Sequence, residues 1–323
     1  MTYVFIFIIS LILTYFIRFF ALKNSLVAKV TERSSHTIPT PHGGGIAIAL
    51  TWFFGLVYLF TCNKMDASLF YALMCGTLLS LVSYLDDVYE LSPKLRLIVQ
   101  ALVSSAGLYA LDGLSVIDLG FYTIENQVIT NVVAFVAIMW CINLYNFLDG
   151  IDGYAGSEAL FLALAGWFLF GGDYFLVLGA SVGGFLVWNW YRAKIFMGDV
   201  GSTLLGYTVG IFALYYQNSG YSIFIWVILF GLFWFDATLT LYRRYKNGEK
   251  LSQAHRKHAY QRAVQSGLRH DSVVLFGVGS NMILLILGYS ALQNSQWLLM
   301  WFLLTLVLLY LLMKIVDRRK KFL

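Results

Sequence analysis

Long apolar runs recur along the whole chain and leave only short polar stretches between them. Eleven of these runs approach the length at which a helix crosses the hydrocarbon core of a membrane, and we place them at roughly 2–22, 43–61, 68–85, 96–111, 131–147, 157–171, 174–190, 203–217, 221–242, 273–291 and 296–316. Only 12% of the 323 residues are charged, against about 25% in a soluble domain. The sequence therefore predicts an all-α polytopic membrane protein with about eleven transmembrane helices and a single membrane-embedded domain over residues 1–323.

The basic residues are distributed very unevenly between the two sides of this arrangement. All but two of the 22 lysine and arginine residues lie in or next to the loops that follow odd-numbered runs, or in the tail; Arg18 and Lys64 are the exceptions. Cytoplasmic loops carry the excess of positive charge in membrane proteins. We therefore expect the amino terminus outside and the carboxyl terminus in the cytoplasm.

A polar ridge emerges at the end of the fifth run, in the stretch N-L-Y-N-F-L-D-G-I-D-G-Y-A-G at 143–156. Asn143, Asn146, Asp149 and Asp152 follow one another at steps of three, which places neighbours on one side of a helix. Polar groups are costly inside a membrane and usually mark a functional site. Asn143 has two interpretations, because it could bind a ligand or hold the end of the helix.

Further acids fall on the same predicted side. Asp86 and Asp87 end the third run, and Asp199 stands between Gly198 and Gly201 just before the eighth. Neighbouring carboxylates repel unless a positive charge is close by, so the pair favours a cation site over a solvated helix end. Asp199 could instead merely cap the next helix. The chain has three cysteines at no metal-binding spacing, and an oxygen-only ligand set favours Mg²⁺, with Mn²⁺ as the alternative.

Three further features complete the pattern: a glycine run, a basic stretch and an acid inside a predicted helix. The run Gly43–Gly45 could present backbone N–H groups to a phosphate, or serve only close helix packing. The stretch His255-Arg256-Lys257-His258 lies in a loop with eight basic residues, which suits a diphosphate or simply reflects cytoplasmic placement. Asp236 lies inside the ninth run, as a functional group or as the partner of a basic residue.

The residues alone thus indicate a membrane-embedded site, open to the cytoplasm, that binds a divalent cation and a phosphorylated ligand. Phosphoryl transfer needs mainly positioning and neutralisation of charge, which this set of groups can supply. A site at the membrane surface also suggests that one substrate is a lipid. We expect no nucleic-acid partner.

Five motifs, spread over nearly the whole chain and each at a predicted cytoplasmic loop, resemble those of a known family. The family is that of the bacterial polyprenyl-phosphate N-acetylhexosamine-1-phosphate transferases, and the fifth motif is most similar to the enzymes that begin O-antigen assembly. The motifs are P-T-P-H-G-G-G at 39–45, L-D-D at 85–87, N-L-Y-N-F-L-D-G-I-D-G at 143–153, F-M-G-D-V-G-S at 196–202 and H-R-K-H-A-Y-Q at 255–261.

The resemblance implies a role for each matching residue. Asp86 and Asp87 would be the paired acids at the phosphate site, one of them the base that deprotonates the polyprenyl phosphate. Asp199 and Asn146 would bind the magnesium ion. The substrate contacts implied are Asn143, Asp149 and Asp152 at the nucleotide, Phe196 stacked on uracil with Asn189 nearby, Lys94 at the phosphate site, and His255, Arg256 and His258 at the diphosphate. Similar enzymes tend to have arginine where His42 stands, so His42 is left out of this set.

The implied reaction joins a UDP-N-acetyl sugar to a polyprenyl phosphate. A lipid phosphate oxygen attacks the phosphorus bonded to the sugar oxygen, and UMP leaves. The implied location is the bacterial cytoplasmic membrane with the site facing the cytoplasm, and dimers occur among similar enzymes. Two other functions remain open from the residues: an ion-coupled or sugar-phosphate transporter, which would have polar groups throughout the bilayer depth, and a structural subunit, which would leave the acids unexplained.

Overall fold

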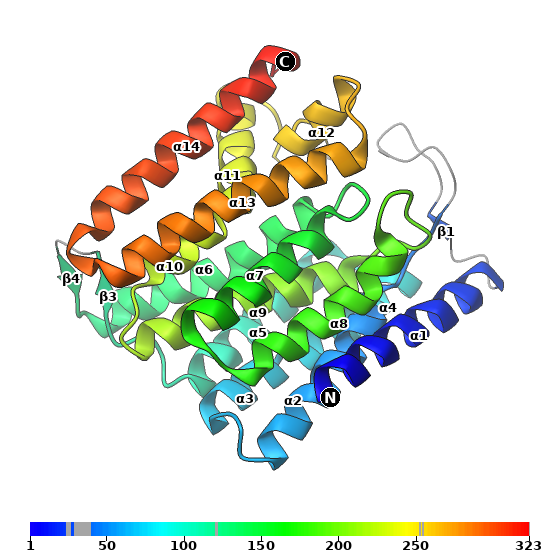
Figure 1. Cartoon of the computed structure of the whole chain (residues 1–323), viewed down its shortest axis with the longest axis horizontal. Coiled ribbons are helices and arrows are strands. Elements are labelled where there is room, and N and C mark those ends of the chain that lie inside the picture. The colour runs from blue at the N-terminus through cyan, green and yellow to red at the C-terminus, as the bar shows by residue number, and fades with distance from the viewer. Residues whose placement is uncertain (24–26, 29–39, 120–121, 252, 254, 323) are drawn as a thin grey trace.

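A bundle of helices makes up almost all of the protein (Figure 1). The computed structural model describes residues 1–23, 27–28, 40–119, 122–251, 253 and 255–322. Pro39 of the first motif, and Lys29 and Arg33 among the basic residues, lie outside these ranges. The helices are α1 (Thr2–Lys23), α2 (Gly45–Thr61), α3 (Ala67–Met74), α4 (Gly76–Tyr89), α5 (Pro93–Ala110), α6 (Gln127–Phe147), α7 (Tyr154–Phe170), α8 (Asp173–Asn189), α9 (Asp199–Asn218), α10 (Ile223–Leu229), α11 (Gly231–Lys246), α12 (Ala259–Gln265), α13 (His270–Gln293), the 3-10 turn η1 (Ser295–Trp297) and α14 (Leu298–Arg319).

The few strands form two short antiparallel pairs. β1 (Val27–Ala28) pairs with β2 (Thr40–Pro41), and β3 (Ile117–Asp118) pairs with β4 (Thr123–Ile124) in the connection between α5 and α6. Each pair is two residues long, so the strands add little to the helical bundle.

Each of the eleven predicted runs coincides with a helix or with two consecutive helices. Among the described residues, five segments are long and apolar enough to cross a membrane, and a sixth qualifies if α10 and α11 form one broken span with a 79° bend. The protein is thus an all-α multi-pass membrane protein, as the sequence predicts. The predicted number of eleven spans and the orientation of the termini stay predictions.

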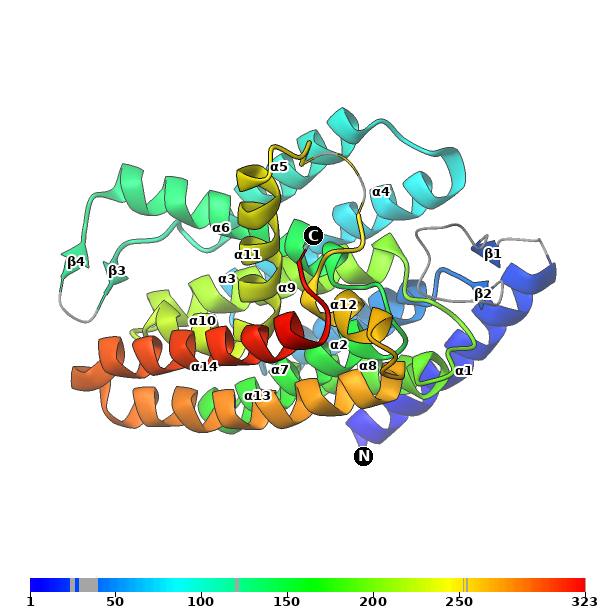
Figure 2. The same cartoon turned by 90° about the horizontal axis from the view of Figure 1, so that it is seen from above.

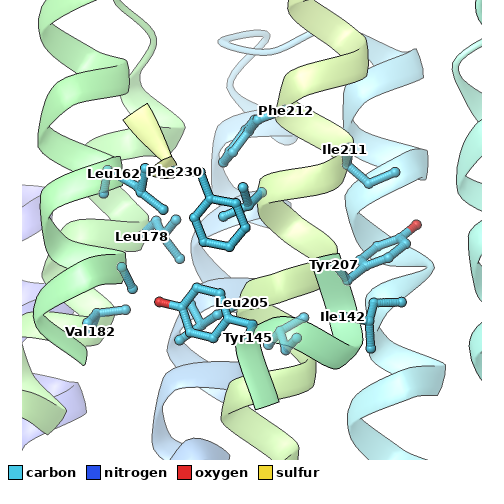
Figure 3. Packing of buried hydrophobic residues seen from close by; sticks show 14 of the residues in the cluster. Ile142, Tyr145, Leu162, Leu178, Val182, Leu205, Tyr207, Ile211, Phe212 and Phe230 are labelled. Atoms are coloured by element: carbon cyan, nitrogen blue, oxygen red, sulfur yellow. The ribbon is translucent and has the colours of Figure 1, made fainter. Parts of the chain in front are cut away.

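The most enclosed helix is α9, which lies at the centre of the bundle (Figures 1 and 2). It packs against α6, α4 and α2, and most of its residues are buried. Figure 3 shows Tyr207 and Phe212 of α9 among side chains of α6 and α8. Since α9 is surrounded by other helices, polar residues such as Thr208 and Gln217 are accommodated inside it, and it does not need the uniformly apolar surface of a lipid-facing helix.

The glycine run at the start of α2 is used for packing. The N–H groups of Gly44 and Gly45 donate to the carbonyl oxygens of Phe196 and Met197, at 2.9 and 2.8 Å. A Cβ atom on Gly45 would lie 2.3 Å from the backbone nitrogen of Gly201. These two amides are therefore already occupied, and the close-packing interpretation is correct for them, whereas the phosphate interpretation is not. The same contacts bring the segment before α9 against the start of α2.

The break between α10 and α11 turns the chain sharply across the bundle (Figure 2). Trp234 donates its indole N–H to the carbonyl oxygen of Val227 at 2.7 Å, which satisfies one of the acceptors that the break leaves free. Beyond this break, α11 carries Asp236, Arg243 and Arg244.

Candidate active site

A cavity of about 350 Å³ opens where the loop after α6 meets the segment before α9. It brings together seven residues predicted from the sequence: Asp87, Asn146, Asp149, Asp152, Asn189, Phe196 and Asp199. His42, Gln261 and His270 also line it. Four of the lining side chains are carboxylates, and none of the described lining residues is a lysine or an arginine.

The loop after α6 is held in place by hydrogen bonds to its backbone. Gly153 adopts a left-handed conformation (φ 75°) just before α7, and its N–H donates to the amide oxygen of Asn189 at 3.1 Å. The amide nitrogen of Asn189 donates to the carbonyl oxygen of Ile195 at 2.9 Å. Asn189 therefore joins the two loops that form the cavity. Its own polar atoms are used within the protein, so its role is to position the cavity wall.

Asp152 is buried and oriented by two neighbours. One of its carboxylate oxygens accepts the N–H of Ala193 at 3.2 Å and lies 3.3 Å from Nδ1 of His270. His270 stands at the start of α13 and is only 8% exposed. Sequence reasoning missed His270, because a single histidine before an apolar run carries no distinguishing pattern. Its contact with Asp152 is visible only in the fold.

Asn146 and Asp199 face each other across the junction of α6 and α9. The hydroxyl of Ser202, one turn into α9, donates to the amide oxygen of Asn146 at 2.8 Å. Burial raises the pKa of Asp199, and Arg96 opposes this rise. An amide and a carboxylate thus both lie at the cavity wall, and the metal site predicted for them stays a prediction.

The two acids at the end of α4, Asp86 and Asp87, have different surroundings. Asp86 accepts the N–H of Leu91 at 2.8 Å and a guanidinium hydrogen bond from Arg96 at 2.8 Å. Asp87 lines the cavity, where its carboxylate lies 4.0 Å from Nδ1 of His42. Asp86 is therefore a structural anchor for Arg96, and Asp87 is the member that faces the cavity.

Arg96 occupies the place predicted for Lys94. It bonds Asp86 at 2.8 Å and lies 3.6 Å from Asp199, whereas the side chain of Lys94 is exposed and lines neither this cavity nor its neighbour. The structure does not bring Lys94 to either cavity, and its predicted role as a basic residue of the site stays a prediction. Residues two apart on a helix point to different faces, so Arg96 and Lys94 cannot both reach the acids.

A second cavity of about 380 Å³ adjoins the first and shares Asn146 and Asp199 with it. Arg96 lies in its wall, and the rest of that wall is largely apolar: Leu79, Val82, Leu97, Val99 and Phe147. Asn143 also lines this second cavity, where it donates to Gln100 at 2.8 Å and to the carbonyl oxygen of Met139 at 2.7 Å. Asn143 therefore shares the second cavity with Asp199 but does not line the first, and its contact with Gln100 joins α6 to α5.

The segment 255–258 lines neither cavity. His258 is 3% exposed, and its Nδ1 lies 3.5 Å from a carboxylate oxygen of Asp236. Asp236 also accepts the N–H of Ala259 at 2.8 Å, so it acts as the partner of the segment that begins α12. Burial beside His258 lowers the pKa of His255 to about 4, which leaves that imidazole neutral at physiological pH. The structure does not bring His255, Arg256 or His258 to the cavity where a diphosphate was expected.

Most of the positive charge in this region is also neutralised locally. Glu249, Asp317 and Asp271 pair with five of the eight basic residues of the loop: Arg243, Arg244, Lys257, Arg262 and Arg269. Most basic residues of this loop therefore form ion pairs with acidic side chains of the protein itself.

The electrostatics of the first cavity call for a cation. Burial, together with the nearby charge of Asp199, raises the pKa of Asp149 to about 7. Asp87, Asp149, Asp199 and Asn146 offer the oxygen ligands that Mg²⁺ prefers. In the described part of the chain, no three histidine, cysteine or acidic side chains form a complete metal site. Such a set fits Mg²⁺, which is commonly held by one or two carboxylates together with substrate phosphates and water.

Comparison with known proteins gives a consistent picture. Residues 69–217 match the family model described as glycosyl transferase family 4. The chain is 31% identical to the probable undecaprenyl-phosphate N-acetylglucosaminyl 1-phosphate transferase of Bacillus subtilis (strain 168), over 82% of this chain and 77% of that protein. It is 29% identical to the undecaprenyl-phosphate alpha-N-acetylglucosaminyl 1-phosphate transferase of Yersinia pestis, over 95% of this chain and 89% of that protein. It is 28% identical to the enzyme of the same name from Escherichia coli (strain K12), over 94% of this chain and 86% of that protein.

Proposed function

The chain belongs to the family of polyprenyl-phosphate N-acetylhexosamine-1-phosphate transferases, and we propose that it transfers an N-acetylated sugar-1-phosphate from a UDP-sugar to undecaprenyl phosphate. The product is a lipid-linked sugar diphosphate that begins a glycan such as an O-antigen, and UMP is released. The observation that carries the proposal is the first cavity, where four carboxylates gather with no lysine or arginine among the described lining residues.

The first cavity is the donor site. A UDP-sugar diphosphate is an anion and would be repelled by these carboxylates, so it enters together with Mg²⁺. Asp199 and Asn146 would hold the ion, with Mn²⁺ as a substitute, and a bound ion would supply positive charge to the phosphate oxygens. Phe196 supplies an aromatic face for uracil, and Asp149 and Asp152 lie on the nucleotide side. Asn189 and His270 position that wall of the cavity: Asn189 accepts the N–H of Gly153, and His270 contacts the carboxylate of Asp152.

The second cavity is the acceptor site. Its apolar wall suits the first units of a polyprenyl chain, and Arg96 suits the phosphate head. The two cavities share Asn146 and Asp199, so the acceptor phosphate and the donor diphosphate meet at the metal. This arrangement supports transfer between a water-soluble donor and a lipid acceptor within one site.

Asp87 is the base. It faces the donor cavity, whereas Asp86 is held by Arg96 and the N–H of Leu91. Asp87 takes the proton from the polyprenyl phosphate, whose oxygen then attacks the phosphorus bonded to the sugar oxygen. A new P–O bond forms, the P–O bond to UMP breaks, and UMP leaves with the electron pair. Arg96, Asp199 and Asn146 hold the reacting groups in place.

The proposed setting is the bacterial cytoplasmic membrane, crossed eleven times by one domain with the amino terminus outside. The uneven distribution of basic residues along the sequence supports this orientation. The site then opens to the cytoplasm, where UDP-sugars are available. A homodimer is the assembly we propose, by analogy with similar enzymes.

A direct assay tests this function. The purified protein is incubated with undecaprenyl phosphate, Mg²⁺ and a panel of UDP-N-acetyl sugars, and UMP is measured. We expect UMP with at least one sugar, and none when the lipid is omitted. If a folded sample releases no UMP with any sugar, the transferase proposal is wrong. Sugar-phosphate uptake into proteoliposomes that contain the protein would instead support a transporter.

A further inference from the structure

The short helix α12 packs against α14 (Figure 2). Gln261 of α12 lines the donor cavity. Its neighbour Tyr260 donates to the carbonyl oxygen of Phe147 at 3.1 Å, and a Cβ atom on Gly150 would lie 2.1 Å from the Tyr260 hydroxyl. The position of α12 therefore fixes part of the loop that carries Asp149.

On its other side, α12 is bound to the end of α14 through Arg262. The Arg262 guanidinium donates to the carboxylate of Asp317 at 2.6 Å and to the carbonyl oxygen of Lys320 at 2.8 Å. It also donates to the carbonyl oxygen of Lys257 at 3.1 Å, just before α12 begins. The side chain of Arg262 is only 3% exposed, so its charge depends on these partners.

Asp317 forms ion pairs with two arginines from two different helices. Its second partner is Arg243 of α11, which donates to both carboxylate oxygens, at 3.0 and 2.9 Å. One carboxylate thus joins α11, α12 and α14 at a single point. Without it, two guanidinium groups would lie side by side with no anion between them.

The ring of Phe322 packs against the same cluster. The cations of Arg243, Lys257 and Arg262 lie 5.3, 5.6 and 5.4 Å from the centre of its ring, within the range of a cation–π interaction. The residues after α14 therefore pack onto this group of basic residues, next to α11 and α12 (Figure 1).

We propose that Asp317 and Phe322 form a latch that positions α12 and thereby sets the affinity of the donor cavity for its nucleotide-sugar. Asp317 is a positioning residue, since it acts through Arg262 and α12 and does not line either cavity. None of the latch residues lines the acceptor cavity. Gln261 of α12 lines the donor cavity, whereas α12 reaches the acceptor cavity only through the Tyr260 hydrogen bond to the backbone carbonyl of Phe147. The latch therefore acts mainly on the UDP-sugar. This inference rests on the proposed function of the donor cavity.

The test compares Asp317→Asn with wild type in the UMP-release assay, varying donor and acceptor separately. Asparagine keeps the size of the side chain but cannot neutralise two arginines. We expect the KM for the UDP-sugar to rise about tenfold, while kcat and the KM for undecaprenyl phosphate stay within about twofold. Phe322→Leu should move the donor KM in the same direction, and Asp317→Glu should restore most of the loss.

A matched control breaks an acid–base pair elsewhere. Asp173→Asn removes the partner of Lys64, 3.0 Å away and outside both cavities, and should leave both KM values unchanged. A parallel rise in both KM values, or unchanged KM values in Asp317→Asn, overturns the proposal.

A second measurement separates this inference from the proposed function. Hydrogen–deuterium exchange of the peptide covering 259–265 should be faster in Asp317→Asn than in wild type, with exchange in α9 unchanged. This readout needs no activity. If wild type releases no UMP but the 259–265 peptide exchanges faster in Asp317→Asn, the proposed function is wrong, while the positioning of α12 by Asp317 is supported. If the peptide exchanges at the wild-type rate, the latch is wrong whatever the activity.

Discussion

Replacing Asp149 with asparagine should make the metal-free protein more stable at pH 8. Burial and Asp199 raise the pKa of Asp149 from 3.8 to about 7. A shift of about three units corresponds to a destabilisation of roughly 4 kcal/mol when the folded protein holds the ionised form. Because Asp149 lines a cavity that water can enter, screening reduces this to about 1–2 kcal/mol. Asparagine removes the charge and keeps the shape.

The pH dependence has a definite sign. The folded protein retains the Asp149 proton up to about pH 7, whereas the unfolded chain releases it near pH 3.8. The stabilisation from that proton is fully present below the unfolded value and is lost as the pH rises through the folded value. The advantage of Asp149→Asn is therefore greatest at pH 8 and shrinks as the pH falls from 7 toward 4.

Thermal unfolding of the detergent-solubilised protein measures the effect. In a metal chelator at pH 8, we expect Asp149→Asn to raise the Tm by roughly 3–6 °C, since about 1 kcal/mol corresponds to 2–4 °C in a chain of this size class. Adding Mg²⁺ should raise the Tm of wild type more than that of the variant. A lower Tm in Asp149→Asn at pH 8, or a difference independent of pH, would refute the electrostatic account of the cavity.

Other substitutions test the remaining parts of the site. Asp199→Asn should abolish turnover while leaving the protein in the membrane, which UMP release and membrane fractionation would check; near-normal activity would remove Asp199 from the metal site. Arg96→Ala should lower kcat/KM for undecaprenyl phosphate by about a hundredfold, whereas Lys94→Ala should change it less than twofold, and equal effects would contradict the assignment. Gly45→Ala should lower the Tm by several degrees because its Cβ would meet the backbone of Gly201 at about 2.3 Å, and an unchanged Tm would show that the contact relaxes freely.

The sequence predicted the positions of the helices well, for a simple physical reason. An apolar run in a membrane protein must satisfy its backbone hydrogen bonds internally, so it forms a helix. The helix that fits this pattern least is α9, whose polar residues are shielded by its neighbours. The 79° bend between α10 and α11 also left no trace in the pattern of apolar residues.

The candidate site was predicted in part. Asn146, Asp149, Asp152 and Asp199 converge because their loops lie at the same end of the bundle, which the charge distribution indicated. The choice between Arg96 and Lys94 could not be made, since it depends on which face of α5 meets α4. His270 and Gln261 come from distant segments with no motif of their own. The pairing of Arg262 in the basic loop with Asp317 was hidden for a related reason, because Asp317 lies far along the chain.

The central claim is that the sugar-bearing phosphorus moves from a nucleotide to a lipid. It is tested most directly with a UDP-N-acetyl sugar that carries a radioactive label in the phosphate next to the sugar. In membranes with Mg²⁺ and undecaprenyl phosphate, the label should move into the organic phase as a lipid-linked sugar diphosphate, in an amount equal to the UMP released. Chelation of the metal should stop the transfer. Label that remains in the aqueous phase, as nucleotide or as free sugar phosphate, would contradict the account.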